Sequence, residues 1–332
     1  MKKTFSKIVV VAKETPYEQY LRKKAQGKAP VALRWERLRN RYETHKECVI
    51  KVQSILKKLD VNFTIVHREE MHRGTLLGVD LVIAVGGDGT TLNASSFLDD
   101  SIPILGVNSD PTKPEELGVL KLKDERRSTG ALCAMTADNV KAALPLIIGG
   151  EIPTRARTRL QCMARGHYTE TRLPAALNDI LIAHPCPASV SRFRLDICNG
   201  KVTPAFERTG RPSQVSSINV WSSGVWISTS VGSSAAMYAA GGTLMDRGSS
   251  NLQYMVREHL LEQGQHKDMG HGIIDSTKMI NIRWNSQQGC IYVDGSHLTH
   301  SLELGDEISI DCHAPPLNIF DANDVNIALK QL

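Results

Sequence analysis

The chain has 332 residues, of which 41% are hydrophobic and 23% charged, so it has room for two globular domains and is neither disordered nor fibrous. Its formal net charge of +5 is small and dispersed, which argues against a nucleic-acid partner, and its apolar runs fall short of the roughly 20 residues that span a membrane. Seven scattered cysteines without a Cys-x-x-Cys pair suit free thiols in a reducing compartment. We therefore expect a cytoplasmic protein without membrane partners, with the peroxisome as a weaker alternative because the terminal Lys330-Gln331-Leu332 departs from Ser-Lys-Leu.

The first third of the chain alternates strand-like and helix-like segments. Short apolar runs predict strands at residues 8–12, 62–66, 81–85 and 102–107, and apolar residues at helical spacing predict a helix within residues 32–59. Such alternation is typical of a parallel sheet flanked by helices, with ligand loops at the carboxyl ends of the strands. We expect this N-terminal α/β domain to occupy residues 1–125.

The remainder of the chain has a different pattern. A predicted helix at residues 138–148 is followed by short alternating segments at residues 157–165, 176–183, 191–199, 216–220, 224–229, 278–284, 289–293 and 307–312. This density of short strands predicts a C-terminal, mostly antiparallel β-sandwich domain at residues 126–310. The segment Pro315-Pro316-Leu317-Asn318 is not expected to continue a sheet, so residues 311–332 should form a tail that packs back on the first domain.

The most informative segment runs from Asp80 to Leu92 and reads D-L-V-I-A-V-G-G-D-G-T-T-L. A buried strand leads into a glycine turn and then into a helix that begins near Thr90. Gly86, Gly87 and Gly89 permit positive φ and a close approach of the backbone to a ligand. Because the N–H groups of the turn and the helix start are available, this loop predicts a phosphate-binding site.

Asp88 distinguishes this loop from a simple dinucleotide-binding turn. A carboxylate among phosphate-binding amides would repel a bare phosphate, so it needs a hydroxyl group or a metal ion to act on. In the alternative interpretation, Asp88 only caps the helix. The loop is not a P-loop, because no Gly-Lys-Ser/Thr follows the glycines. No metal site is predicted either, since His266 and His271 have no third ligand nearby.

The G-G-D-G-T sequence at residues 86–90 resembles the motif shared by NAD kinases, diacylglycerol and sphingosine kinases and phosphofructokinases. Asn178-Asp179 resembles the Asn-Glu/Asp motif of NAD kinases, and residues 227–242 resemble their T-P-T-G-S-T-A-Y segment, which ends in Gly-Gly. Alone, these two segments would be a common turn dipeptide and a small-residue turn before a helix. All three occur in the order of that family, which argues against coincidence.

Further segments are similar to plant-type NADH kinases, over about residues 45–320. They are residues 107–111, 128–130, 178–193, 255–258 and 292–295. The resemblance implies the NAD kinase fold and a kinase that transfers phosphate from ATP to the adenosine ribose 2′-hydroxyl of NADH, and less well of NAD. It also implies Mg²⁺ to offset the phosphate charge, and a homodimer.

The resemblance assigns the site residues as follows. Asp88 would be the catalytic base, and the amides of Gly86, Gly87, Gly89 and Thr90 would bind the phosphates of ATP. The residues implied for NAD(H) binding are Asp88, Gly89, Asn178, Asp179, Ser233, Ser234, Ala235, Tyr238 and Asp294.

The chain also departs from the NAD kinase pattern. Ser223, Ala236 and Ser296 stand where that family usually has Asp, Tyr and Gln. Loss of a carboxylate near the positively charged oxidised nicotinamide predicts a preference for NADH. Two alternatives are a lipid kinase of the same superfamily, which would favour an exposed apolar surface, and a catalytically silent NADP(H)-binding protein, which would be expected to have lost Asp88.

Overall fold

The computed structural model describes residues 4–28, 35–111, 130–204, 207, 212–260 and 267–332. The chain divides into two compact units, one of residues Met1–Arg155 with Asn318–Leu332 and one of residues Ala156–Leu317. This division lies later than the expected boundary between residues 125 and 126, because helix α5 (Val140–Gly149) packs in the core of the first unit. Among the described helices, none is long and apolar enough to cross a membrane.

The first unit contains a parallel sheet. Its central strands, in the order β4-β3-β1-β2, are β4 (Ile104–Asn108), β3 (Leu81–Gly86), β1 (Lys7–Ala12) and β2 (Asn62–His67). The short strand β5 (Met135–Thr136) and the end of β17 (Glu307–Phe320) both pair with β4. Apart from Asn108 at the end of β4, the buried residues of β1, β3 and β4 are apolar, as expected for strands covered on both faces.

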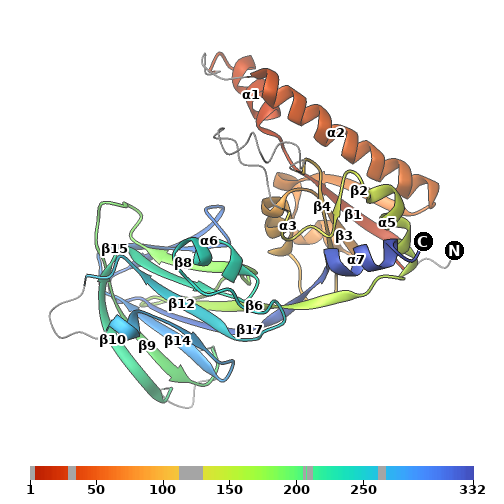
Figure 1. Ribbon diagram of the computed structural model, residues 1–332. Helices are drawn as coiled ribbons and strands as arrows, with labels where there is room; N and C mark the ends of the chain where they lie inside the picture. The colour runs from red at the N-terminus through yellow and green to blue at the C-terminus, as the bar shows by residue number, and fades with distance from the viewer. Residues whose placement is uncertain (1–3, 29–34, 112–129, 205–206, 208–211, 261–266) are drawn as a thin grey trace. The chain divides into compact units, whose positions relative to one another are not determined.

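Helices cover both faces of this sheet (Figure 1). On one face, α2 (Trp35–Lys58), α5 and α7 (Ala322–Leu329) share a core with alternate residues of β1, β3 and β4. On the other face, α3 (Asp88–Ser95) contacts β1, β3 and β4. Helix α1 (Pro16–Ala25) and the 3₁₀ turns η1 (Arg68–Glu70) and η2 (Arg73–Leu76) lie in the loops after β1 and β2.

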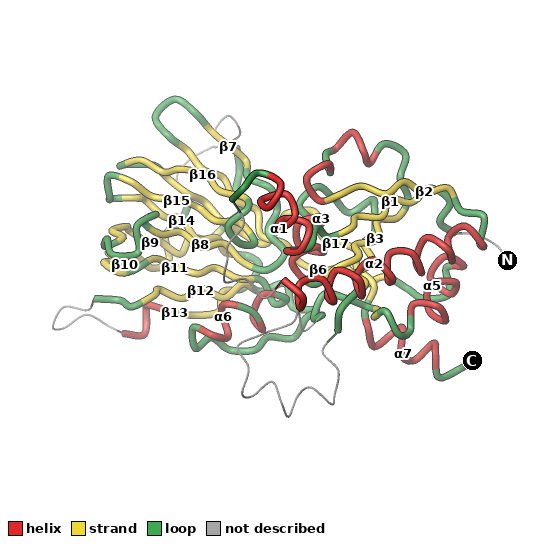
Figure 2. The backbone as a smooth tube through the Cα atoms, turned by 90° about the horizontal axis from the view of Figure 1, so that it is seen from above, coloured by secondary structure: helices red, strands yellow, loops and turns green. Residues whose placement is uncertain are grey.

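The second unit is a sandwich of two largely antiparallel sheets (Figure 2). One sheet has the order β10-β9-β14-β17, with β6 and β7 attached. Its strands are β6 (Thr154–Arg165), β7 (Glu170–Arg172), β9 (Ser191–Asn199), β10 (Gln214–Ser222), β14 (Lys278–Trp284) and the first part of β17.

The other sheet of the sandwich has the order β13-β12-β11-β8-β15-β16. Its strands are β8 (Asp179–Ala183), β11 (Gly224–Ser228), β12 (Leu252–Arg257), β13 (His271–Ile274), β15 (Gln288–Val293) and β16 (Leu298–Glu303). Alternate apolar residues of both sheets form one core, which includes Phe193, Trp284, Ile227 and Ile291. The turns η5 (Gly232–Ser234) and η6 (Lys267–Gly270) and the helix α6 (Ala236–Ala239) complete the unit.

The expectation that Pro315 and Pro316 end the last strand is wrong, since both lie within β17. Proline cannot donate a ladder hydrogen bond, but its carbonyl can still accept one. Here the buried guanidinium of Arg159 donates to the Pro315 carbonyl oxygen over 2.7 Å. Beyond the prolines, Ile319 pairs with Ile104 of β4, so the C-terminal residues 318–332 rather than 311–332 belong to the first unit.

Candidate functional site

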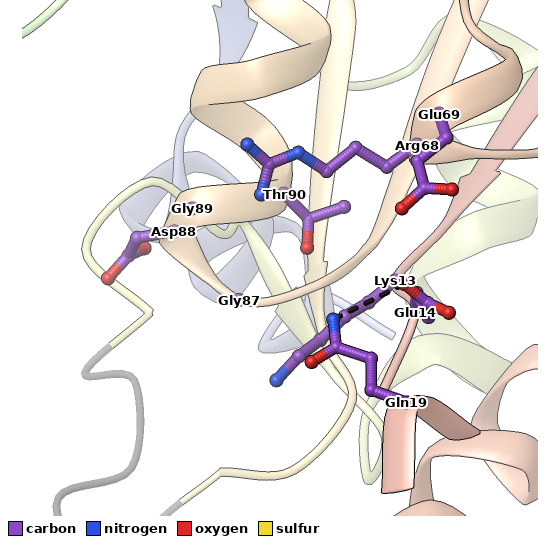
Figure 3. Close-up of a pocket in the computed structure, with 9 residues that line it drawn as sticks. All are labelled: Lys13, Glu14, Gln19, Arg68, Glu69, Gly87, Asp88, Gly89 and Thr90. Carbon is purple, nitrogen blue, oxygen red and sulfur yellow. Dashed lines mark hydrogen bonds between the residues drawn. The ribbon is translucent and has the colours of Figure 1, made fainter. Parts of the chain in front are cut away.

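The first part of the candidate site lies at the carboxyl ends of four parallel strands. Lys13, Arg68, Gly87 and Ser109 each follow directly on one of the strands β1, β2, β3 and β4. A cavity of ≈ 390 Å³ opens there and is lined by Lys13, Glu14, Gln19, Arg68, Glu69, Gly87, Asp88, Gly89 and Thr90 (Figure 3). This edge of a parallel sheet is where ligands commonly bind in α/β domains.

The glycines of the loop do not adopt the positive φ angles expected from the sequence. None of the three has a positive φ, and Gly87 is extended at φ −133° because β3 leads directly into α3. Gly86 is required for space, since a Cβ atom there would lie 2.2 Å from the Thr90 Oγ1 atom. A Cβ atom at Gly89 would meet nothing within 4 Å, so the space beside Gly89 is open to a ligand.

The backbone N–H groups of the loop are unequally available. The amides of Thr90 and Thr91 both donate to the Gly87 carbonyl oxygen, over 2.9 Å and 3.3 Å. Gly86 closes β3, and its carbonyl accepts the Ser109 N–H group over 2.9 Å. Since the first N–H groups of a helix lack α-helical partners, the amides of Gly87 and Gly89 are better placed for a phosphate than the Thr90 amide, which already donates to Gly87.

Asp88 is the first residue of α3 and borders the cavity. Its two carboxylate oxygens accept the backbone N–H groups of Gly130 over 3.1 Å and Leu132 over 2.8 Å. Gly130 has φ +73°, and a Cβ atom there would lie 2.7 Å from the Asn108 Nδ2 atom, so glycine is needed at this position. The loop after β4 thus fixes the orientation of the Asp88 carboxylate.

A buried histidine joins the ends of β1 and β4. The Nδ1 atom of His45 lies 2.8 Å from the Ser109 hydroxyl, and its ring also bonds the Lys13 backbone. Burial, and then the charge of Lys13, lower the pKa of His45 to about 4, so the ring is neutral at pH 7 and can accept from Ser109. Both residues, with Lys13 and Arg41, line a second cavity of ≈ 110 Å³.

The second part of the candidate site lies in the sandwich unit, around the start of β8. The Asp294 carboxylate accepts the N–H groups of Leu177, Asn178 and Asp179 over 2.8, 2.7 and 3.1 Å. Asp294 itself has φ +51° and donates its N–H group to the Asp179 carbonyl oxygen. The structure therefore brings Asn178, Asp179 and Asp294 together, with Asp294 holding the backbone of the other two.

Two carboxyl groups in this cluster are buried, with Asp179 6% and Asp294 7% exposed. Burial, and then the charge of Asp294, raise the pKa of Asp179 to about 7. Burial also raises the pKa of Asp294, but its three backbone donors and Arg159 oppose that shift. When the pair holds one proton, it therefore resides on Asp179, which can then donate as well as accept a hydrogen bond.

The segment at residues 227–242 packs against the same strand start. The Thr229 hydroxyl donates to the Leu177 carbonyl oxygen, and a Cβ atom on Gly232 would lie 2.0 Å from the Asn178 carbonyl oxygen. Ser233 is 1% exposed, and its hydroxyl donates to Ser230 and accepts from the Met245 N–H group. Its side chain therefore supports the turn.

The neighbouring residues expected to bind NAD(H) are more accessible. The side chains of Ser234 and Tyr238 are exposed, and Ala235 is half-buried. These three residues remain candidates for contact with the substrate.

A carboxylate lies next to Ser223, at the position where loss of one was expected. The Ser223 hydroxyl hydrogen-bonds the side chain of Glu258, which follows β12 and has φ +39°. Glu258 also lies 3.7 Å from the guanidinium of Arg257. A carboxylate paired with Arg257 therefore lies beside position 223, on the residue that follows β12.

Sequence reasoning missed Lys13, Arg68 and His45. Their positions just after β1 and β2, and on the helix that covers β1, could have singled them out. No group of three or more His, Cys, Asp or Glu side chains within the described ranges could hold a metal ion. His271 opens β13, and His266 lies outside the described residues.

Known proteins with similar sequences place this chain in a family. A family model, the ATP-NAD kinase N-terminal domain, matches residues 18–111. The probable NADH kinase of rice, Oryza sativa subsp. japonica, is 42% identical over 283 residues, which are 85% of this chain and 83% of the rice protein. The chain belongs to the NAD kinase family. The NADH kinase of Arabidopsis thaliana is 39% identical over 87% of each chain, and membership in this family makes the protein a kinase.

Solved structures of this family have the same fold. Yeast NADH kinase complexed with NADH matches with a TM-score of 0.65 at 15% sequence identity. The match covers 99% of this chain and 88% of the yeast chain. An NAD kinase from Archaeoglobus fulgidus in complex with ATP has a TM-score of 0.63 at 17% identity, over 98% and 97% of the two chains. The predicted fold class is confirmed. Nothing among these relatives supports the lipid-kinase alternative.

Proposed function

We propose that this NAD kinase family member transfers the terminal phosphoryl group of ATP to the 2′-hydroxyl of the adenosine ribose of NADH, and less efficiently of NAD. The main observation behind this proposal is the position of Asp88. Its carboxylate is held by two backbone N–H groups and lies beside the open amides of the glycine loop. The names of the rice and Arabidopsis relatives, both NADH kinases, support NADH as the acceptor.

The chemical step follows from these groups. The 2′ oxygen of the ribose attacks the γ-phosphorus while Asp88 accepts the proton of that hydroxyl. The bond from the γ-phosphorus to the bridging β–γ oxygen breaks, and ADP leaves. The amides of Gly87 and Gly89 hold the phosphates in line for attack. Mg²⁺ arrives with ATP as part of the substrate and offsets the phosphate charge.

In the sandwich unit, Asn178 would bind the ribose hydroxyls, and Asp179 the nearby ribose or adenine edge. Ser234, Ala235 and Tyr238 would contact the adenine, while Asp294 and Ser233 act by holding the backbone that carries these groups. A neutral Asp179 can donate to a ribose oxygen, which an ionised carboxylate cannot do.

The test is an incubation of purified protein with MgATP and NADH, with NADPH and ADP measured separately. We expect the two products in equal amounts. ATP hydrolysis without NADPH, or phosphorylation of diacylglycerol or sphingosine instead, would contradict the proposal. A homodimer and a cytoplasmic location stay predictions, for sedimentation and for imaging of a tagged protein.

A further inference from the structure

The cavity at the glycine loop contains two cationic side chains with no partner among the described residues. Lys13 follows β1 and Arg68 opens η1 after β2. Neither side chain makes a hydrogen bond or ion pair with any described residue. Figure 3 shows both side chains reaching toward the loop, Arg68 toward Thr90 and Lys13 toward Gly87. Two uncompensated cations beside open amides indicate an anionic ligand of high charge.

The acidic residues of the same cavity do not neutralise these cations. Glu14 forms an ion pair with Arg22 and accepts a hydrogen bond from Gln19 over 3.3 Å. The Asp88 carboxylate is taken up by two backbone N–H groups. Glu69 also lines the cavity, but it forms no ion pair with Lys13 or Arg68 within the described part of the chain. The positive charge of Lys13 and Arg68 is therefore directed at the space in front of the loop.

We propose that Lys13 and Arg68 bind the triphosphate of the donor nucleotide, Lys13 beside Gly87 and Arg68 beside Thr90. This inference rests on the proposed function for the identity of the donor. A triphosphate stays anionic with Mg²⁺ bound, and the loop amides carry only partial charges. Lys13 supplies a compact charge, whereas the planar fork of Arg68 can bind two phosphate oxygens at once.

The test measures binding of MgATP and of NADH by calorimetry to the variants Lys13→Met and Arg68→Met, which remove the charge and keep an unbranched apolar stem in place of the longer cationic side chain. A charge-assisted hydrogen bond is worth roughly a tenfold to hundredfold change in affinity. We expect the Kd for MgATP to rise by about that factor in each variant, the Kd for AMP to change less, and the Kd for NADH to stay nearly constant. Arg68→Lys should give an intermediate loss.

The matched control is Arg73→Met, which removes an exposed cation from η2, outside the cavity; it should leave the Kd for MgATP unchanged. Thermal unfolding shows whether each variant is folded. Unchanged MgATP binding in both cavity variants, or no MgATP binding by the wild type, would overturn this inference. Loss of MgATP binding in the variants, together with a wild type that forms no NADPH, would instead support this inference and refute the proposed function.

Discussion

Replacing Asp88 with Asn is the sharpest perturbation of the proposed chemistry. The substitution keeps the shape of the side chain and removes its ability to accept a proton. In the structure, Asp88 also accepts two backbone N–H groups, from Gly130 and Leu132. An Asn side chain has only one acceptor oxygen, so its NH₂ group would face one of these donors. The variant therefore tests catalysis and loop anchoring together.

The two effects have different sizes and different readouts. Loss of a general base typically lowers the rate by ~10²–10⁴, whereas one buried donor left without an acceptor costs about 1–3 kcal/mol of stability. We expect the kcat of Asp88→Asn to fall at least about a hundredfold, its Kd for NADH to change little, and its free energy of unfolding to drop by ~1–3 kcal/mol.

The assay is steady-state NADPH formation with urea unfolding of the same preparations. The control is Gly130→Ala, which disturbs the anchoring loop, because its Cβ atom would lie 2.7 Å from the Asn108 Nδ2 atom, and keeps the Asp88 carboxylate. It should lose stability with a much smaller loss of kcat. A folded Asp88→Asn protein with nearly wild-type kcat, or equal losses of kcat in both variants, would refute the assignment of Asp88 as the base.

Three further predictions concern the loop, the buried carboxyl pair and the choice of acceptor. Gly86→Ala should destabilise the protein because of its clash with the first turn of α3, whereas Gly89→Ala should unfold like the wild type but bind MgATP more weakly; equal melting temperatures for both would contradict this. The pKa of Asp179 is raised to about 7 in the folded protein, so the free energy of unfolding of the wild type should fall as pH rises from about 4 to 7. The free energy of unfolding of Asp179→Asn, measured in urea titrations relative to the wild type, should therefore increase over that range by at most ~4 kcal/mol and then stay constant. A difference that does not depend on pH would refute the shift. Ser223→Asp should raise kcat/KM for NAD relative to NADH severalfold, and Glu258→Gln should lower it; if neither ratio moves, charge at this position does not select the acceptor.

Sequence periodicity was a good guide to most of this fold. β9 and β14 have the expected bounds, because apolar residues recur along each strand and gather on its buried face. Helix α1 was missed although Thr15 and Glu18 form a capping box around a proline at the helix start. The continuation of β17 through Pro315 was not predicted, since proline usually ends a strand and the Arg159 side chain that donates to the Pro315 carbonyl oxygen is distant in the sequence.

The candidate site was only partly visible in the sequence. The motif around Asp88 and the pair Asn178-Asp179 carry local signals and were found. The roles of Asp294 and Ser233 in holding the backbone depend on hydrogen bonds between residues far apart in the chain or buried in turns. The positive φ expected in the glycine loop is absent, because the strand enters the helix with an extended residue at Gly87.

The preference between NADH and NAD tests the account most directly, because it requires both the kinase chemistry and the proposed acceptor. The measurement is kcat/KM for each dinucleotide at saturating MgATP, with NADPH and NADP separated chromatographically. We predict that both are phosphorylated, with the higher kcat/KM for NADH. A higher kcat/KM for NAD would contradict the proposed acceptor preference, and no phosphorylated product from either would contradict the account as a whole.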